Sequence, residues 1–136
     1  PSPAPMSWIE WYQALRKPAW TPAPATIGLI WRILYPILFA SLVFVAVQAF
    51  RRRLPRALLV PFAVNLAANL AFTPLQFGLR SLVLSSLDIL VVWGSILWMI
   101  AASWGHHRGL ALAQLPYLAW VSLATVLQLS ITWMNR

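Results

Sequence analysis

Long apolar runs separated by very short polar connectors dominate the hydropathy pattern of the chain. Windows of roughly 20 residues, the length needed to cross about 30 Å of hydrocarbon, fit four segments at about 25–50, 57–77, 80–103 and 109–134. Such short connectors force antiparallel neighbours, so the segments predict an up-down bundle. The predicted fold class is therefore all-α, an integral membrane bundle of four transmembrane helices, because helices satisfy every backbone polar group inside lipid.

Residues 1–24, ahead of the first span, show a different pattern. Ser7 and Glu10 have the S-x-x-E spacing of a capping box, and a short amphipathic helix is predicted over about 8–16. The proline-rich stretch "KPAWTPAPA" after it predicts an extended connector. We therefore expect two regions, an N-terminal interfacial helix with a proline-rich loop over 1–24, folded over the bundle, and the bundle itself over 25–136. One face of the short helix would carry Trp8, Trp11, Tyr12 and Leu15.

Composition supports a membrane location and excludes several other classes of protein. Of 136 residues, 61% are hydrophobic and only 9% are charged, which is too apolar for a water-soluble core of this size. Cysteine is absent, so disulfides and thiolate metal sites are excluded. The largest cluster within the net charge of +8 is Arg51, Arg52, Arg53 and Arg56, between two spans. This pattern is typical of a positive-inside loop, so it favours a cytoplasmic 51–56 loop and no nucleic-acid partner.

Polar side chains recur on one face of the second span, at Asn65, Asn69, Thr73 and Gln76. An amide that faces lipid leaves its donors and acceptor unpaired, so we expect this stripe to point into the bundle or a cavity. Two interpretations stay open. The stripe either forms structural hydrogen bonds between helices or lines a ligand cavity.

The last span and the nine tryptophans give a weaker indication of a binding site. An indole at the end of a span is explained by the interfacial belt alone, as for Trp8, Trp11, Trp20, Trp104 and Trp133. Deeper indoles need another reason, and these are Trp31, Trp93, Trp98 and Trp120. One face of the last span, which suits a flat ligand as well as ordinary helix packing, carries Tyr117, Trp120, Ala124 and Gln128.

Few side chains in the spans are suited to catalysis. Asp88 is an intramembrane acid, whose burial costs about 2.5–3.5 kcal/mol on insertion scales, so it is protonated, paired or functional. A structural hydrogen-bonding role and a proton-transfer role both stay open for Asp88. The adjacent pair His106 and His107 has no acid or cysteine nearby, and we predict no metal site there. No nucleophile, base and orienting residue stand at a recognisable spacing, so an enzyme is the least supported class.

Five motifs occur in an order that matches a known family. They are "WYQALRKPAWTP", "WRILY", "NLAFTPLQFG", a mid-span Trp93 and "PYLAWVSLATVLQ", with a final "MN" after them. In this order and spacing the chain, over about residues 8–135, resembles the tryptophan-rich sensory protein and translocator protein family.

The resemblance implies a helical membrane protein, usually a homodimer, whose bundle opens a pocket beneath the loop that joins the family's first two spans. Family members bind protoporphyrin and other tetrapyrroles, sterols, and isoquinoline or benzodiazepine drugs, and have been linked to transport, stress signalling and porphyrin breakdown. The lid it implies consists of Trp11, Tyr12, Leu15, Lys17, Pro18, Trp20 and Pro22. The pocket walls it implies are Trp31, Tyr35, Asn69, Phe72, Trp93, Trp120 and Ala124, and the polar faces add Asn65, Tyr117 and Gln128 as binding candidates.

The sequence departs from the family pattern at several places. The family has five spans, and the span that precedes the "WY" loop is not in this sequence, so we expect a four-span form whose gap is filled by a partner helix or a second copy, unless a native helix precedes Pro1. Phe72 stands where the family usually has Trp, Gln76 where it has one of two paired Phe residues, and Gln128 where it has Asn.

These observations favour a membrane receptor or carrier for a flat hydrophobic ligand, foremost a porphyrin or haem-like tetrapyrrole and next a sterol, with no required cofactor. Intramembrane indoles offer stacking faces, the Asn stripe offers hydrogen bonds, and Arg16 with Lys17 offers partners for propionates. Two alternatives stay open, an accessory subunit of a larger membrane complex and a small exporter driven by protons through Asp88. The expected location is the lipid bilayer of a bacterial cytoplasmic membrane.

Overall fold

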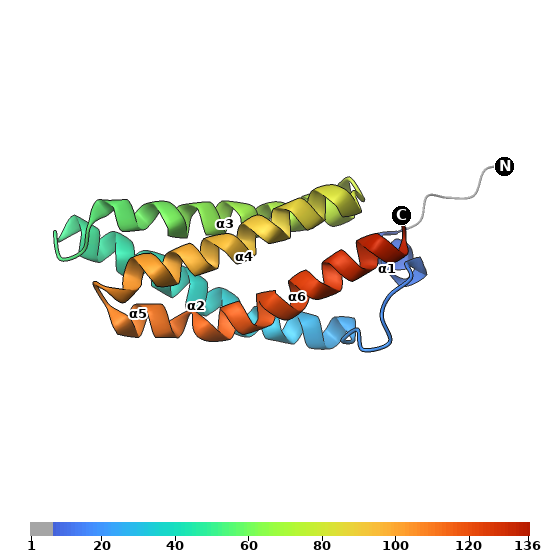
Figure 1. The fold of residues 1–136 in the computed structure, drawn as a ribbon, viewed down its shortest axis with the longest axis horizontal. Coiled ribbons are helices and arrows are strands. Elements are labelled where there is room, and N and C mark those ends of the chain that lie inside the picture. The colour runs from blue at the N-terminus through green and yellow to red at the C-terminus, as the bar shows by residue number, and fades with distance from the viewer. Residues whose placement is uncertain (1–6) are drawn as a thin grey trace.

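The computed structural model describes residues 7–136, and all regular structure within them is helical (Figure 1). The elements are α1 (Trp8–Ala14), α2 (Pro24–Phe50), the 3-10 turn η1 (Arg56–Leu58), α3 (Leu59–Thr73), the π-helical turn η2 (Pro74–Gly78), α4 (Leu82–Trp104), α5 (Arg108–Ala113) and α6 (Leu115–Met134). The predicted all-α class is confirmed, because four helical segments are long and apolar enough to cross a membrane.

These four segments agree with the predicted spans to within two residues at each end. They are Pro24–Phe50, Arg56–Gly78, Leu82–Trp104 and Arg108–Met134. The agreement follows from the hydropathy pattern, because in a membrane the apolar length of a helix is fixed by the thickness of the hydrocarbon.

Local sequence explains where several helices begin. Pro24 is the first residue of α2, where its fixed φ suits a helix and its missing N–H is not needed. The Ser81 hydroxyl caps α4 by accepting a hydrogen bond from the Leu84 N–H at 3.1 Å. His107 caps α5, with Nδ1 accepting from the Leu110 N–H at 2.9 Å. This cap gives His107, one of the two adjacent histidines, a structural role.

The long helices form a bundle in which α4 packs against both α3 and α6, and α2 packs against α3 (Figure 1). Val45, Phe62, Ile96 and Met99 are fully buried where these helices meet. Arg52 adopts a positive φ of 59° in the tight turn that follows α2, and this reverses the chain toward α3. Such short connections between antiparallel neighbours are those the sequence predicts.

The short helix α1 lies at one end of the bundle, beside the C-terminal end of α6 (Figure 1). It begins as the capping box predicts, since the Ser7 Oγ accepts from the Glu10 N–H at 3.3 Å. It ends at Ala14, two residues earlier than predicted, because Leu15 is already extended with ψ of 145°. Residues 1–6, part of the predicted N-terminal region, lie outside the described residues.

A chain of hydrogen-bonded side chains, here called the mid-bundle network, ties all four long helices together. The Tyr35 hydroxyl donates to Asn69 Oδ1 at 3.2 Å, and Asn69 Nδ2 donates to the Tyr117 oxygen at 2.6 Å. The Tyr117 hydroxyl donates to Asn65 Oδ1 at 3.0 Å, and Asn65 Nδ2 reaches Ser95 Oγ at 2.9 Å. For Asn65 and Asn69, the interpretation of the polar stripe as hydrogen bonds between helices therefore holds.

Candidate functional site

A cavity of about 380 Å³ lies between α1 and the adjoining ends of the four long helices. Its volume falls at the lower end of the range for ligand sites, so it would enclose a drug-sized ligand or part of a larger macrocycle. Most of its wall is apolar, and its aromatic side chains are Trp8, Tyr12, Trp31, Tyr35, Phe72, Phe77 and Trp120. Such a surface favours stacking against a flat ligand.

Seven of the ten predicted binding residues lie in the cavity wall, namely Trp31, Tyr35, Asn69, Phe72, Trp120, Ala124 and Gln128. The other three do not. Asn65 and Tyr117 are buried in the mid-bundle network. Trp93 is 37% exposed on the outside of the bundle, where its Nε1 donates to Ser122 Oγ at 3.0 Å. The resemblance alone had suggested Trp93, and the rotation of α4 turns it away from the cavity.

Among the predicted lid residues, only Tyr12 lines this cavity; the others are Trp11, Leu15, Lys17, Pro18, Trp20 and Pro22. Lys17, predicted to contact the propionates of a ligand, instead donates hydrogen bonds to backbone carbonyls. Its Nζ donates to the carbonyls of Tyr12 at 2.7 Å and Leu15 at 3.2 Å, which satisfies free carbonyl groups at the end of α1. Trp20 is 48% exposed.

Phe77 holds α1 in place, a role that the sequence reasoning did not assign. Its ring meets Trp8, Tyr12 and Trp11 edge-on, with centroid distances of 5.3, 6.0 and 6.2 Å. Edge-to-face aromatic pairs of this kind contribute about 0.5–1.5 kcal/mol each. Trp8, which the interfacial belt seemed to explain, is in fact part of the cavity wall. The common face of Trp8 and Tyr12 in the sequence was the signal that could have placed it there.

The segment after α1 is also fixed to the far end of the chain. The Arg16 N–H donates to Asn135 Oδ1 at 2.9 Å, and Asn135 Nδ2 donates back to the Arg16 carbonyl at 2.8 Å. Both ends of the Asn135 amide are thus used to close one loop over the cavity end of the bundle. Tyr12, only 8% exposed, is buried beneath this loop, and burial raises the pKa of its hydroxyl above the usual 10.0.

Two polar atoms in the cavity wall have no hydrogen-bond partner among residues 7–136. They are the Gln76 carbonyl oxygen Oε1 and the Trp120 indole nitrogen Nε1, whose residues are 4% and 9% exposed. Buried polar groups are paired in nearly all folded proteins, so each unpaired atom at a cavity points to a partner outside the chain. Asp88 Oδ2 and Gln114 Oε1 also have no hydrogen-bond partner among residues 7–136, but neither residue lines this cavity.

Asp88 lies on α4, about 9 Å along the helix from its first residue, and does not line the cavity. Neither an ion pair nor a hydrogen bond joins its carboxyl to another described residue. Its proposed structural or proton-transfer role therefore stays a prediction.

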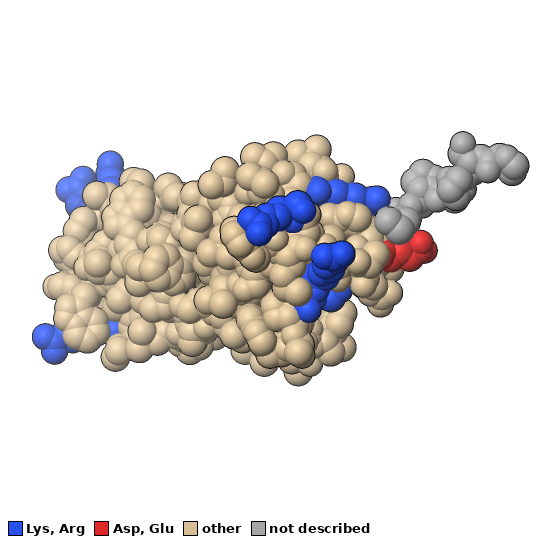
Figure 2. All heavy atoms as spheres, turned by 45° about the vertical axis from the view of Figure 1, so that its right-hand side comes forward, with Lys and Arg blue, Asp and Glu red and all other residues tan. Residues whose placement is uncertain are grey.

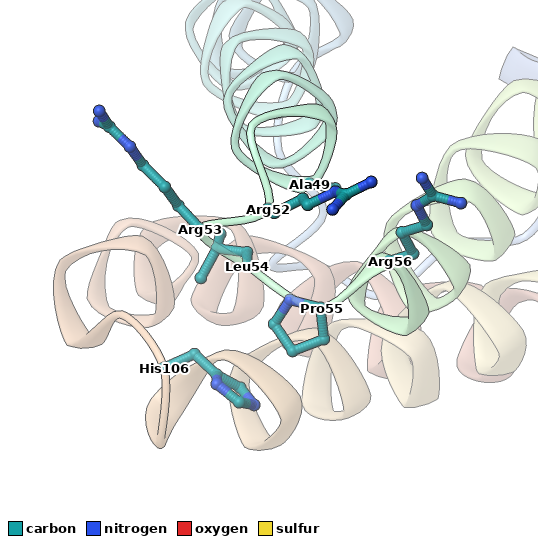
Figure 3. Close-up of a pocket in the computed structure, with 7 residues that line it drawn as sticks. All are labelled: Ala49, Arg52, Arg53, Leu54, Pro55, Arg56 and His106. Carbon is teal, nitrogen blue, oxygen red and sulfur yellow. The ribbon is translucent and has the colours of Figure 1, made fainter.

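A second hollow, of about 610 Å³, lies at the other end of the bundle and has a different chemistry. It is lined by Arg52, Arg53, Arg56 and His106 together with Ala49, Leu54 and Pro55 (Figure 3). Figure 3 shows the Arg53 side chain pointing away from Arg52 and Arg56. Lys and Arg also gather at this end in the space-filling view, with a wide uncharged surface between them and the other cations (Figure 2). A hollow lined by three arginines and a histidine, with no aromatic ring of Trp, Tyr or Phe, is unsuited to a flat hydrophobic ligand.

Within the described residues, no cluster of three or more His, Cys, Asp or Glu side chains could hold a metal ion. The fold and the cavity together define a multi-pass membrane protein with a cavity lined by aromatic side chains at one end of its bundle. The chain belongs to the TspO/MBR family, whose sequence profile matches residues 2–134.

Relatives in bacteria and mammals share this match over most of their length. An uncharacterised membrane protein of Bacillus subtilis, YtaB, is 33% identical over 126 residues, covering 93% of this chain and 81% of the relative. The tryptophan-rich protein TspO of Bacillus cereus is 33% identical over 126 residues, covering 92% and 80%. The human translocator protein is 33% identical over 125 residues, covering 88% and 71%. The predicted family is therefore confirmed.

Proposed function

We propose that this protein is a membrane receptor or carrier for a flat hydrophobic ligand, foremost a porphyrin, which binds in the cavity beneath α1. Membership of the TspO/MBR family supports a receptor or sensory role in the membrane. The name of the human relative, translocator protein, supports a transport role as well. Porphyrin binding rests on the resemblance of the motifs and on the aromatic character of the cavity.

The observation that carries this proposal is the unpartnered Trp120 Nε1 in an aromatic wall. The rings of Trp31 and Tyr35 stand one turn apart with centroids 5.3 Å from each other and planes tilted by 34°, and they offer adjacent aromatic faces to a macrocycle. Trp120 adds a donor that is ready for a ligand acceptor, and no described side chain competes for it. A hydrophobic wall with one or two fixed polar groups is typical of small-molecule sites.

The proposal includes two features of the setting. Bacterial relatives support a bacterial cytoplasmic membrane, in which the 51–56 loop and its arginines would face the cytoplasm. The family resemblance supports a homodimer, or a partner helix beside the bundle. Labelling of a single cysteine introduced at Arg53 in sealed vesicles tests the first feature, and crosslinking in native membranes tests the second.

Titration of the purified protein with protoporphyrin tests the ligand. We expect quenching of tryptophan fluorescence that saturates, and an affinity about 3- to 10-fold lower in Trp120→Phe, which keeps an aromatic ring but loses the Nε1 donor. Trp104→Phe is the matched control, because Trp104 is exposed at the other end of the bundle, where it packs with Arg108. Absence of quenching, or equal affinities of wild type and Trp120→Phe, would contradict the proposal.

A further inference from the structure

Gln76 is the second cavity-wall residue with an unpartnered buried atom, and it differs from Trp120 in needing a donor. Gln76 is only 4% exposed, and its Oε1 accepts no hydrogen bond from any described residue. We propose that Gln76 selects among flat apolar ligands those that carry an N–H or O–H donor at the edge lying against η2. This inference rests on the proposed function, because it takes the cavity as the ligand site.

The backbone around Gln76 is held by an unusual turn. Pro74 lacks an N–H and interrupts the helical ladder, and the chain continues as a wider π-helical turn. The Leu79 N–H donates to the Pro74 carbonyl at 2.9 Å, and the Ser81 N–H donates to the Leu75 carbonyl at 3.1 Å. The next residue, Phe77, is packed against α1. These contacts fix the backbone on both sides of Gln76, which holds the residue in the cavity wall.

The other two amides of the cavity wall each donate a hydrogen bond to another helix. Asn69 uses both ends of its amide in the mid-bundle network, accepting from Tyr35 and donating to Tyr117. Gln128 Nε2 lies 3.5 Å from the Leu82 carbonyl on α4, a long hydrogen bond that still orients the side chain. Gln76 is the cavity amide whose carbonyl oxygen is both buried and without a hydrogen-bond partner among the described residues.

The burial of this carbonyl makes it selective. Gln76 Oε1 is buried and accepts no hydrogen bond, so a ligand without a donor at this edge leaves it unpaired. A ligand donor at this edge supplies the bond, so the two kinds of ligand should differ in affinity by about tenfold. Trp120 Nε1 is a donor and needs an acceptor from the ligand. A planar lactam has both groups, an N–H donor and a C=O acceptor, on one rigid apolar ring system.

A matched pair of lactams tests the proposal, phenanthridin-6(5H)-one and its N-methyl derivative, which differ in the single N–H donor. Their dissociation constants are measured by tryptophan quenching and by competition against protoporphyrin, for wild type, Gln76→Leu and Gln76→Phe. Gln48→Leu is the control, because it removes an amide at the far end of α2, away from the cavity. Thermal unfolding of each variant in detergent confirms that it is folded before binding is measured.

We expect wild type and Gln48→Leu to bind the N–H lactam about tenfold more tightly than the N-methyl lactam. In Gln76→Leu and Gln76→Phe this ratio should fall to near one. A ratio near one in wild type, or an undiminished ratio in both Gln76 variants, would overturn the proposal. If protoporphyrin binds and neither lactam displaces it, the donor proposal is overturned while the proposed function stands. If protoporphyrin does not bind, the proposed function fails, and the direct lactam titration still decides the role of Gln76.

Discussion

In the middle of the bundle every amide group of Asn65 and Asn69 has a hydrogen-bond partner, whereas at the cavity end of the same helical segment the carbonyl oxygen of Gln76 has none. All three residues are at least nine-tenths buried. Burial and residue type are therefore alike in the two regions, and only the partners differ. In the mid-bundle network the partners are side chains of α2, α4 and α6, and at the cavity end no described side chain takes that place.

This difference separates a structural from a functional use of the same chemistry. A fully satisfied polar network inside a membrane holds helices in one arrangement, since any other packing would leave polar groups unpaired in lipid. An unsatisfied group at a cavity weakens the empty protein slightly and reserves its hydrogen bond for a ligand. The two regions are continuous through Asn69, which belongs to the network and also lines the cavity. We therefore expect the cavity wall at Asn69 to stay rigid when a ligand binds.

The largest expected effect is loss of stability when the network is cut at Asn65. Asn65→Leu removes hydrogen bonds to Tyr117 and Ser95 and leaves the Tyr117 hydroxyl without its acceptor. We expect the free energy of unfolding to fall by about 2–3 kcal/mol. Unfolding by denaturing detergent, followed by circular dichroism, measures this change. A loss below about 0.5 kcal/mol would mean that the network does not stabilise the bundle, and the contrast with the cavity would disappear.

The same contrast marks how far sequence reasoning reaches. The spans follow from apolar length alone, and the polar stripe on one face correctly turned Asn65 and Asn69 into the bundle. The helical period does not tell which amide finds a partner, because that depends on side chains from other helices. It also does not foresee the π-helical turn after Pro74, which sets Gln76 in the cavity wall and Phe77 against α1.

The predicted lid illustrates the same limit. The motif correctly led to an ordered helix and loop at the end of the bundle, with Tyr12 buried, but it made Lys17 a ligand contact. In the structure Lys17 donates to backbone carbonyls of its own segment. The sequence does not tell where the ammonium group of a lysine points, because this depends on which carbonyl groups near it are free. Here the free carbonyls are at the end of α1.

A second prediction concerns the loop that closes the cavity end. Asn135→Ala removes two hydrogen bonds to the Arg16 backbone, and because they are exposed to solvent we expect the loop to be released by about 1 kcal/mol. Trypsin should then cleave the Arg16–Lys17 bond about fivefold faster, since cleavage follows the open population. Asn135→Asp keeps the acceptor for the Arg16 N–H and should fall between wild type and Asn135→Ala. Equal cleavage rates in all three proteins would argue against this closure.

The third prediction reverses the sign of the first. Gln76→Leu makes the same change, amide to leucine, where the amide oxygen has no partner, so it removes an unsatisfied group instead of a bond. We expect the free energy of unfolding to be unchanged or raised by up to about 1 kcal/mol. The assay is the detergent unfolding used for Asn65→Leu, with Gln48→Leu as the control. A loss as large as that of Asn65→Leu would show that Gln76 is part of the structural network.

The smallest effect is a pH dependence of the lid itself. Burial raises the pKa of the Tyr12 hydroxyl above its value of 10.0 in the unfolded chain, because the phenolate is disfavoured beneath the lid. Since the folded pKa is raised, the contribution of the neutral phenol to lid docking is fully present below pH 10 and is lost as the pH rises through the folded pKa. Fluorescence of the lid tryptophans should therefore shift above pH 10 in wild type. The shift should be missing in Tyr12→Phe, which keeps the ring against Phe77 and cannot ionise. If the shift is equally large in both proteins, groups other than Tyr12 cause it. The docking of α1 then does not depend on the ionisation of Tyr12.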